Sequence, residues 1–340
     1  MTHTIALSFE DGVTRFIACG TGETVADAAY RSGINVPFDC RDGACGTCKS
    51  FCEAGSYDAG DYIEDALAAD EAAQGYVLTC QMRPKSDCVV RIAATSAMCK
   101  AAAGTFTARL SRVEQLSATA IRFAVKLEAG AQLSFLPGQY ANLAVPGGGE
   151  VRAYSFASLL REGEVEFLVR NIPGGRMSSY LSERARVGDA IACSGPMGSF
   201  YLRPVTRPLL FLAGGTGLAP FLAMLELLER DGLGVPAHLV YGVTSDRDLV
   251  LVDRLEAFAA RLPGFSFVTC VGDAASTHPR KGYVTHHLAP EHLHCGAVDT
   301  YLCGPPAMVD AVRQHLEAAG VVPAAFHYEK FAPGAQAKAA

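Results

Sequence analysis

The stretch FDCRDGACGTCKSF, at residues 38–51, sets three cysteines in a C-x4-C-x2-C arrangement: Cys40, Cys45 and Cys48. A fourth, Cys80, stands further along the chain within LTCQ. Thiolates at this spacing hold the two irons of a [2Fe–2S] cluster, because one loop supplies three ligands and wraps the cluster. Small residues such as glycine and alanine stand between them, which lets backbone N–H groups turn toward the sulfides. We therefore predict a [2Fe–2S] cluster with these four cysteines as its metal ligands.

A zinc site and a set of unrelated buried cysteines are the alternatives. Zinc ribbons typically use two C-x2-C pairs, and this sequence has one. Cys52 is close enough to the loop to be considered as a ligand, although the distal Cys80 fits the pattern better. Twelve cysteines in a chain that shows no secretion signal favour metal or redox chemistry over disulfides. We expect the others to be small buried hydrophobes, with Cys303 set apart by its motif: Cys19, Cys88, Cys99, Cys193, Cys270, Cys295 and Cys303.

The bulk properties are those of a globular protein with several domains. At 340 residues the chain is longer than one ordinary core needs, which favours two or three domains. Apolar residues make up 50% and charged residues 19%, a balance that excludes a disordered chain. No uncharged apolar run is long enough to span a membrane, and the MTHT start lacks the basic flank and apolar region of a signal peptide. We expect a cytoplasmic monomer with no membrane partner.

The net charge of −6 is concentrated at the N-terminal end. Residues 1–95 contain fourteen Asp and Glu against seven Lys and Arg. No basic residue stands between Lys49 and Arg83, whereas these acidic ones do: Glu53, Asp58, Asp61, Glu64, Asp65, Asp70 and Glu71. Such a segment is either a solvated surface or a docking face for a basic partner, since charged fields raise encounter rates. A nucleic acid is disfavoured as a partner, because binding its phosphates needs the opposite sign of charge.

The pattern of residues 1–95 indicates a small α+β domain. Residues 4–19 alternate polar and apolar positions around an Asp-Gly turn, which is typical of a β-hairpin. A helix follows, with Thr24 as its N-cap. A second hairpin-like stretch runs over residues 75–92, and residues 96–104 have no strong period and are predicted to be a linker.

Two further domains are predicted after this linker. Residues 105–205 consist of short alternating segments separated by Pro and Gly turns, which favours an antiparallel β-barrel. In residues 206–340, apolar runs such as LLFLA and HLVYGV alternate with helical segments such as FLAMLELLERDG. This alternation is typical of a doubly wound α/β domain with a parallel sheet. The predicted fold class is therefore multidomain.

The predicted barrel contains the sequence Arg152-Ala153-Tyr154-Ser155. An Arg can grip a pyrophosphate through two hydrogen bonds, and a Tyr can stack on a flavin ring. A Ser hydroxyl can form a hydrogen bond with flavin N5. By itself this short motif also fits an ordinary strand with an exposed Arg and a buried Tyr.

A glycine turn follows in the same predicted domain, with the sequence GGRMSS at residues 174–179. The turn opens a helix, and free N–H groups at such a terminus bind an anionic phosphate. A plain loop with a capping serine has the same pattern. We predict that cofactor-binding residues lie here and in the strand before the turn: Val169, Gly174, Gly175, Met177 and Ser178.

A third motif, Gly214-Gly215-Thr216-Gly217, directly follows the apolar run PLLFLA and opens a helix that contains Pro220. This is a nucleotide-cradling strand–loop–helix turn, although it is not the G-x-G-x-x-G fingerprint. Glycine at these positions lets the backbone approach a pyrophosphate or ribose closely. A purely structural glycine turn is the alternative. We predict that all five residues bind a nicotinamide nucleotide.

The choice of nucleotide depends on the segment after HLVYGV, residues 244–248. Ser245 and Arg247 would suit the 2′-phosphate of NADPH. Asp246 and Asp248 would repel that phosphate or accept a hydrogen bond from a free ribose hydroxyl. We predict NADH, with Asp246 as a binding residue.

These motifs resemble those of known families. FDCRDGACGTCKSF followed by LTCQ resembles a plant-type ferredoxin domain, a β-grasp fold, over residues 1–95. The R-x-Y-S motif followed by the Gly-Gly turn resembles the FAD-binding barrel of the ferredoxin–NADP reductase family. In that family an element like Cys303-Gly304-Pro305-Pro306 faces the nicotinamide. The resemblance therefore implies that Cys303 and Gly304 bind the nucleotide, with Cys303 as a positioning residue and not a covalent nucleophile.

The resemblance also implies roles near the end of the sequence. Tyr328-Glu329-Lys330-Phe331 resembles the C-terminal segment that lies over the flavin, where Phe331 would cover the ring until nicotinamide displaces it. A packed terminal strand fits the same residues. We predict four catalytic residues: Ser155, Cys303, Glu329 and Phe331.

The order of the three domains resembles the reductase component of two-component aromatic-ring dioxygenases, of the benzoate, toluate or anthranilate type. The resemblance implies electron transfer from NADH to FAD, then to the [2Fe–2S] cluster, and then to a Rieske/non-haem iron oxygenase that docks at the acidic first domain. Hydride carries two electrons and the cluster accepts one at a time, whereas a flavin can do both. The reductase of a di-iron monooxygenase, of the phenol or alkene/methane type, shares this domain order and is the main alternative. A reductase for sugar deoxygenation and a zinc-stabilised nucleotide sensor are the others.

Overall fold

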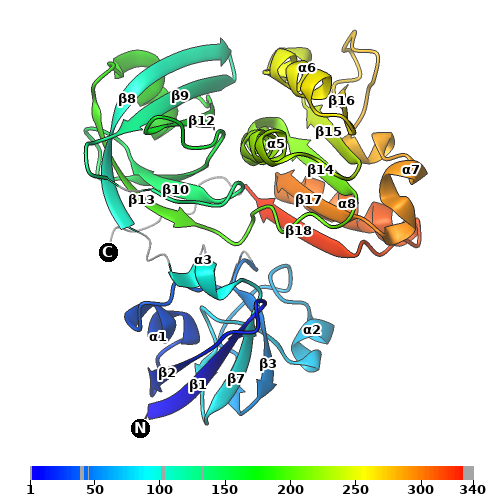
Figure 1. Ribbon diagram of the computed structural model, residues 1–340. Helices are drawn as coiled ribbons and strands as arrows, with labels where there is room; N and C mark the ends of the chain where they lie inside the picture. The colour runs from blue at the N-terminus through cyan, green and yellow to red at the C-terminus, as the bar shows by residue number, and fades with distance from the viewer. Residues whose placement is uncertain (1, 39–41, 45, 101–103, 132, 332–340) are drawn as a thin grey trace. The chain divides into compact units, whose positions relative to one another are not determined.

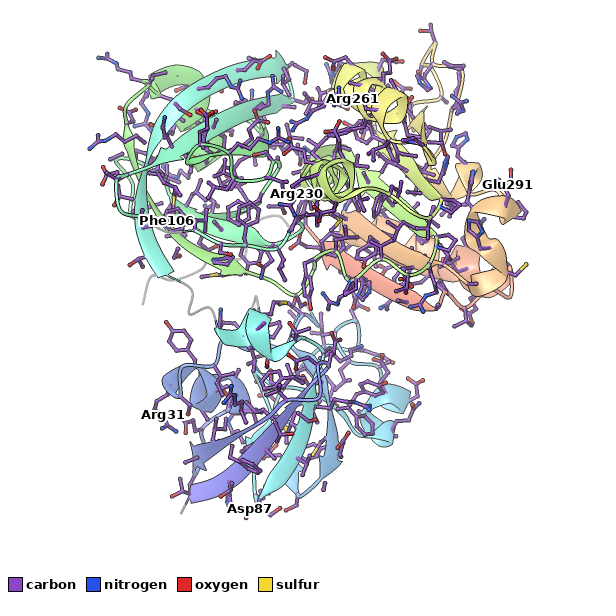
Figure 2. All side chains as sticks on the ribbon, viewed as in Figure 1. Arg31, Asp87, Phe106, Arg230, Arg261 and Glu291 are labelled. Carbon is purple, nitrogen blue, oxygen red and sulfur yellow. The ribbon has the colours of Figure 1, made fainter. Side chains whose placement is uncertain are left out.

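The computed structural model describes residues 2–38, 42–44, 46–100, 104–131 and 133–331 of the chain (Figure 1). Contacts divide the chain into two compact units. The first comprises Met1–Thr105 together with Ser194–Ser199, and the second comprises Phe106–Cys193 together with Phe200–Ala340. Apolar side chains fill the interior of each unit (Figure 2).

The first unit is built on a five-stranded mixed sheet with the strand order β2-β1-β7-β3-β5. Its strands are β1 (Thr2–Phe9), β2 (Thr14–Gly20), β3 (Lys49–Ala54), β5 (Tyr76–Leu78) and β7 (Cys88–Ile92). The central pair β1 and β7 is parallel, whereas β1–β2, β3–β5 and β3–β7 are antiparallel. A mixed sheet with one packed helix, α1 (Val25–Arg31), is the β-grasp arrangement that the sequence predicts.

Of three local predictions for this unit, two are confirmed and one is wrong. The hairpin over residues 4–19 is confirmed as β1 and β2, and the α1 helix begins where Thr24 Oγ1 accepts from the Asp27 N–H at 3.2 Å. The hairpin over residues 75–92 is wrong, because β5 pairs with β3, and β7 lies between β1 and β3. Alternation of apolar residues identifies strands but not their partners, which hydrogen bonds between distant segments decide.

Short elements complete the first unit. The strands β4 (Tyr57–Asp58) and β6 (Arg83–Pro84) form a separate pair, and α2 (Ala69–Gln74) ends at Gly75. Part of the predicted linker, Ser96–Lys100, forms the helix α3, and Cys99 is buried in the core of this unit. The domain boundaries at residues 95, 105 and 205 stay predictions.

Most of a six-stranded sheet, in the order β11-β10-β13-β8-β9-β12, belongs to the second unit, although the first two residues of β8 and the last four of β13 are grouped with the first unit. The strands are β8 (Gly104–Ser117), β9 (Ala120–Leu127), β10 (Tyr140–Ala144), β11 (Val151–Ser155), β12 (Glu164–Arg170) and β13 (Ala190–Met197). The pairs β8–β9, β9–β12 and β10–β11 are antiparallel. A bridge between Phe156 and Phe167 joins the two edges of the sheet, so the predicted antiparallel barrel is confirmed. Helix α4 (Arg176–Ser179) and the π-helical turn η1 (Tyr180–Arg184) follow β12.

The rest of the second unit is a five-stranded sheet, all parallel, in the order β16-β15-β14-β17-β18. Its strands are β14 (Leu209–Gly214), β15 (Ala237–Val243), β16 (Phe265–Val271), β17 (Asp299–Gly304) and β18 (Ala325–Lys330). The chain runs outward from β14 in one direction and then returns to place β17 on its other side. The loops after β14 and β17 therefore meet at a topological switch point, where open α/β sheets bind their ligands.

Helices cover both faces of this parallel sheet (Figure 1). On one face, α5 (Ala219–Asp231) and α6 (Val252–Arg261) pack with Phe211 of β14. On the other, α8 (Pro306–Ala318) packs with Leu210 and Leu212, because neighbouring strand residues point to opposite faces. The connections between strands add α7 (Pro290–Leu293) and the single-turn helices η2 (Gly215–Leu218), η3 (Asp246–Asp248), η4 (Val284–His287) and η5 (His294–Gly296). The doubly wound prediction is confirmed.

Among the described residues, no helix is both long enough and apolar enough to cross a bilayer.

Two histidines of the second unit, the buried His238 and the half-buried His327, have pKa values below the ordinary histidine value. His238 in β15 is 8% exposed, its Nδ1 lies 2.8 Å from Ser266 Oγ, and its ring stacks on His292 at 3.6 Å between centroids. Burial, reinforced by His292, lowers the pKa of His238 to about 4. Burial, reinforced by Arg203, lowers the pKa of His327 to about 4 as well.

We therefore expect acid to destabilise the second unit. In the unfolded chain both histidines bind protons near their ordinary pKa of about 6.5, whereas the folded chain does not bind them until about pH 4. Their stabilising contribution is complete above pH 6.5 and is lost as the pH falls toward 4, by about 2 kcal/mol per histidine at pH 5. Urea unfolding followed by circular dichroism at pH 7.5 and pH 5 measures this loss. His238→Gln should show a smaller loss than the wild-type chain, and an equal loss would contradict the assignment to His238.

Candidate functional site

The structure describes two of the four predicted cluster ligands. Cys48 and Cys80 are buried thiols whose sulfur atoms lie 3.3 Å apart. This is longer than the bond of about 2.0 Å in a disulfide. It is close to the roughly 3.8 Å that separates two thiolates on one tetrahedral metal with bonds of about 2.3 Å. The pair therefore fits a shared metal ion, and Cys40 and Cys45 lie outside the described residues.

The loop around these ligands is fixed by backbone contacts. Gly43 has a φ of +77°, and a Cβ atom there would lie 2.4 Å from the Asp61 carbonyl oxygen, so only glycine fits. The Ile63 N–H donates to the Gly43 carbonyl at 3.2 Å. Beside the other end of the site, the Gln81 side-chain amide lies 3.8 Å from Cys80 Sγ and donates to it. Such donors to a ligand sulfur tune the metal that it binds.

The alternative ligand, Cys52, is engaged elsewhere. Its thiol lies in β3 and donates to the Ala54 carbonyl oxygen at 3.3 Å. Burial, reinforced by the neighbouring Cys88, raises the pKa of Cys52 to about 11. The geometry therefore favours Cys80 as the fourth ligand. The prediction that the remaining cysteines are buried is wrong for Cys295, which is exposed in the turn before β17.

In the barrel, the R-x-Y-S strand and the Gly-Gly turn come together at one carboxylate. Arg152 in β11 and Arg176, the first residue of α4, lie 3.7 and 3.4 Å from Glu150 Oε2. The sequence did not single out Arg176, because the glycines and serines around it carried the phosphate-turn pattern. Two guanidinium groups that share one partly exposed carboxylate could exchange it for a pyrophosphate, which arginines bind through paired hydrogen bonds.

The other predicted flavin residues are mostly buried. Tyr154 packs edge-on against Phe123, and burial raises its pKa. Val169 and Met177 belong to the barrel core. The Ser178 hydroxyl donates to the Ile172 carbonyl at 3.1 Å, so this side chain stabilises the turn itself. Gly174 has a φ of +71° and Gly175 lies against that turn. Only backbone groups of these turn residues remain for a ligand.

At the switch point of the parallel sheet, the two glycine loops touch. A Cβ atom on Gly217 would lie 2.3 Å from the Cys303 carbonyl oxygen, and one on Gly214 would lie 3.4 Å from Gly304 Cα. Gly215 has a φ of +56° with open space beside it. Thr216 is half-buried, and Pro220 is buried in the first turn of α5. Glycine is therefore required here for two reasons. Gly214 and Gly217 let the two loops approach each other, and Gly215 leaves open space beside its backbone.

Three predicted catalytic side chains meet in one cluster. Ser155 Oγ, at the end of β11, donates to Glu329 Oε2 at 3.1 Å. Cys303 Sγ, at the end of β17, lies 3.7 Å from the same oxygen. Burial, reinforced by Glu329, raises the pKa of the Cys303 thiol well above its ordinary value, so the thiol stays protonated and donates. This state suits a positioning residue and not a nucleophile.

The last predicted catalytic residue, Phe331, follows β18. Its N–H donates to the Gly304 carbonyl at 3.0 Å, and its ring packs against the core of the parallel sheet. The strand β18 pairs with β17, with Cys303 opposite Glu329. The alternative of a packed terminal strand is therefore confirmed for β18, and the role of Phe331 over the flavin stays a prediction.

The nucleotide-choice segment lies at the carboxyl end of β15. Asp246 is exposed and its Oδ1 accepts from Ser276 Oγ at 2.7 Å. Asp248 is turned inward and accepts from Ser245 and Thr119. Of the two acidic residues, Asp246 is exposed and Asp248 is half-buried, so the role of Asp246 at a ribose hydroxyl stays a prediction.

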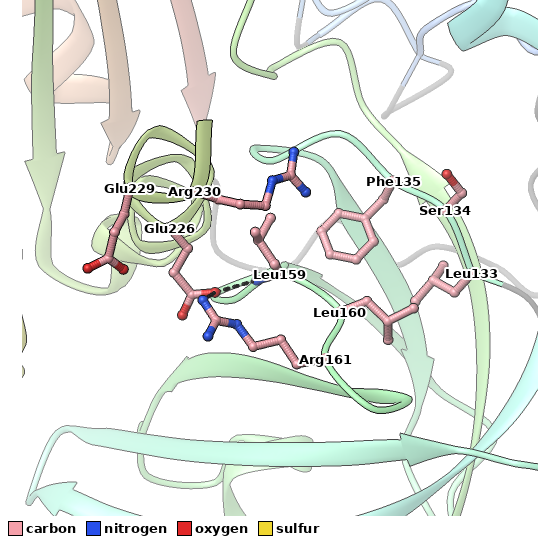
Figure 3. Close-up of a pocket in the computed structure, with 9 residues that line it drawn as sticks. All are labelled: Leu133, Ser134, Phe135, Leu159, Leu160, Arg161, Glu226, Glu229 and Arg230. Carbon is pink, nitrogen blue, oxygen red and sulfur yellow. Dashed lines mark hydrogen bonds and ion pairs between the residues drawn. The ribbon is translucent and has the colours of Figure 1, made fainter. Parts of the chain in front are cut away.

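A pocket of about 560 Å³ lies away from these residues, between the barrel and the C-terminal half of α5 (Figure 3). Phe135, Leu159 and Leu160 form its apolar wall. Its charges are paired, since Glu226 accepts from the Leu159 N–H at 2.9 Å and lies 3.4 Å from Arg161. This ion pair connects the barrel with α5. It leaves neither Glu226 nor Arg161 with an unpaired charge for a ligand.

Family models match three consecutive parts of the chain. They are the 2Fe-2S iron-sulfur cluster binding domain at residues 8–85, the oxidoreductase FAD-binding domain at residues 107–201 and the oxidoreductase NAD-binding domain at residues 211–314. The matched segments contain the predicted cysteines, the barrel motifs and both glycine loops of the switch point.

Two curated relatives align over nearly their whole length. The toluate 1,2-dioxygenase electron transfer component of Pseudomonas putida is 59% identical, covering 98% of this chain and 100% of that protein. The 2-halobenzoate 1,2-dioxygenase electron transfer component of Burkholderia cepacia is 51% identical, covering 98% and 99%. Among solved structures, the Amycolatopsis cytochrome P450 reductase GcoB has a TM-score of 0.74 and 33% identity, covering 97% of this chain and 99% of that one.

We predict that Gly217→Ala separates the two loops of the switch point. The added methyl group meets backbone and not a flexible side chain, so the loops must move apart. We expect kcat/KM for NADH to fall by about tenfold or more while bound FAD, measured by absorbance, is retained. Gly149→Ala is the matched control, because a Cβ atom there meets nothing within 4 Å. Equal activity in both variants would show that the loops are not closely packed in solution.

Proposed function

Since this chain belongs to the family of dioxygenase electron transfer components, with [2Fe–2S], FAD-binding and NAD-binding domains, we propose that it moves electrons from NADH to an aromatic-ring oxygenase. The chain is an oxidoreductase. The benzoate-type dioxygenase is favoured over a di-iron monooxygenase as the system that it serves, because toluate and 2-halobenzoate dioxygenase components are its relatives. We propose that it works as a cytoplasmic monomer.

The cluster of Ser155, Cys303 and Glu329 is the observation that carries this proposal. It joins the end of a barrel strand to the carboxyl ends of β17 and β18, so groups bound to the barrel and to the parallel sheet would meet there. When bound, FAD accepts an electron pair as hydride and passes electrons on singly, which is what a [2Fe–2S] cluster requires.

The protein's own residues would hold and orient these groups. Arg152 and Arg176 would bind the FAD pyrophosphate in place of Glu150, and the loops at Gly214–Gly217 would admit the nucleotide backbone. Glu329 holds both the Ser155 hydroxyl and the protonated Cys303 thiol, which fixes their orientation at the meeting point. Phe331 would exclude water from it. Asp246 would accept a hydrogen bond from the ribose and select NADH.

Electrons would leave through the four thiolates of the first unit. Cys48 and Cys80 would hold one iron, and the loop cysteines Cys40 and Cys45 would hold the other. The exposed residues Asp61, Glu64 and Asp65 surround Ile63, which is 50% exposed and is bonded to the cluster loop through Gly43. We propose that this acidic surface, with its apolar centre, docks a Rieske/non-haem iron oxygenase.

We predict that Cys48→Ser blocks electron transfer through the cluster but not hydride transfer to the flavin. The variant should lose NADH–cytochrome c reduction and keep NADH–ferricyanide activity within about twofold, since hydride still enters at the flavin. Cys52→Ser is the control in the next strand and should keep both activities. Loss of both activities in a Cys48→Ser protein that retains FAD would contradict the proposed order of the cofactors.

We also predict that charge reversal on the acidic surface weakens docking. Glu64→Lys/Asp65→Lys should raise the KM for a purified benzoate-type oxygenase by about tenfold at low salt, and less at high salt, because ionic strength screens exposed charges. NADH–ferricyanide activity should not change. Glu10→Lys, an exposed site outside the surface, is the control. A KM that is unaffected by the double reversal would place docking elsewhere.

A further inference from the structure

A hydrogen bond connects the barrel to the nucleotide-choice turn. Thr119 lies at the tip between β8 and β9, and its Oγ1 donates to Asp248 Oδ1 at 2.6 Å. This length is typical of a hydroxyl that donates to an ionised carboxylate, which is stronger than a bond between neutral groups. The two residues come from different parts of the second unit, so no local sequence pattern predicts their contact.

Both carboxylate oxygens of Asp248 accept hydrogen bonds from the protein. Its second oxygen, Oδ2, accepts from the Ser245 N–H at 3.0 Å and from Ser245 Oγ at 2.8 Å. Burial opposes ionisation of Asp248, but the hydrogen bonds from Thr119 and Ser245 prevail and its pKa is lowered. Asp248 therefore closes the turn as a charged acceptor.

The barrel side of this contact is itself fixed. The Thr119 N–H donates to Ser117 Oγ at 3.1 Å, and the two hydroxyls lie 3.1 Å apart. The Asn171 N–H donates to the Thr119 carbonyl at 2.7 Å. Since the single hydroxyl proton of Thr119 goes to the carboxylate, Ser117 must donate to Thr119 Oγ1. The hydroxyl is thus aimed at Asp248 before any nucleotide binds.

The turn held in this way carries Asp246. Asp246 is exposed, and its Oδ1 is oriented by Ser276, which is 4% exposed. Asp248 anchors the turn to the barrel, and Ser276 orients the Asp246 carboxylate.

We propose that Thr119 is a specificity-determining positioning residue: through Asp248 it fixes the turn at residues 245–248, so that Asp246 meets the ribose hydroxyls of NADH. The inference rests on the proposed role of Asp246 in nucleotide choice. A mobile turn would still bind the nucleotide, with a weaker hydrogen bond to the ribose and a weaker repulsion of a 2′-phosphate.

The test uses the full chain with its cofactors and measures kcat and KM for NADH and NADPH with ferricyanide. Thr119→Val removes the hydroxyl at constant shape, and it should raise the KM for NADH by about tenfold while kcat stays within about twofold. The ratio of kcat/KM for NADH over NADPH should fall. Thr119→Ser should restore both values, and Thr206→Val, an exposed threonine outside the contact, should leave them unchanged.

Asp246→Ala distinguishes a failure of this inference from a failure of the proposed function. If Asp246→Ala lowers the ratio and Thr119→Val does not, the role of Thr119 is overturned and that of Asp246 stands. If Asp246→Ala leaves the ratio unchanged, both roles are overturned. Should Thr119→Val not fold, Asp248→Asn carries the test, and the same rise in KM for NADH is expected from it.

Discussion

The hydrogen bonds that Ser155 and Cys303 donate to Glu329 are the interaction on which, we propose, the function of the second unit depends. They tie a strand of the barrel to two strands of the parallel sheet at the switch point, where the chain reverses its direction across the sheet. The Cys303 thiol remains protonated because it is buried beside a carboxylate. A barrel that binds FAD and a sheet that binds a nucleotide are useful for hydride transfer only if their ligands meet, and this cluster lies where they would.

The two units have different tasks because electrons enter in pairs and leave singly. The second unit supplies positioning, through arginines at the barrel surface and glycines at the switch point. The first supplies the cysteine loop, in which Gly43 has no alternative because a side chain would collide with the backbone at Asp61. An acidic exterior then favours approach of a positively charged partner. In the proposed function, hydride chemistry thus belongs to the second unit and partner recognition to the first.

Much of this could be predicted from the sequence, because the decisive motifs are local. Cys48 with its neighbours, the glycines after β14 and Cys303 after β17 each occupy a fixed place relative to one strand or loop. What could not be predicted depends on contacts between distant segments. The pairing of β5 with β3, the contact of Arg176 with Glu150 and the bond from Thr119 to Asp248 join residues from separate segments of the chain. Exposure of Cys295 follows from a turn that composition does not reveal.

The most direct test of the central claim is low-temperature electron paramagnetic resonance of the anaerobic wild-type protein after reduction with NADH, combined with iron, labile sulfide and zinc analysis. We predict iron and sulfide in equal amounts and the signal of a reduced [2Fe–2S] cluster, approaching one spin per chain, because electrons reach the cluster through the flavin. A flavin that bleaches with NADH while no cluster signal develops would contradict it, as would zinc in place of iron.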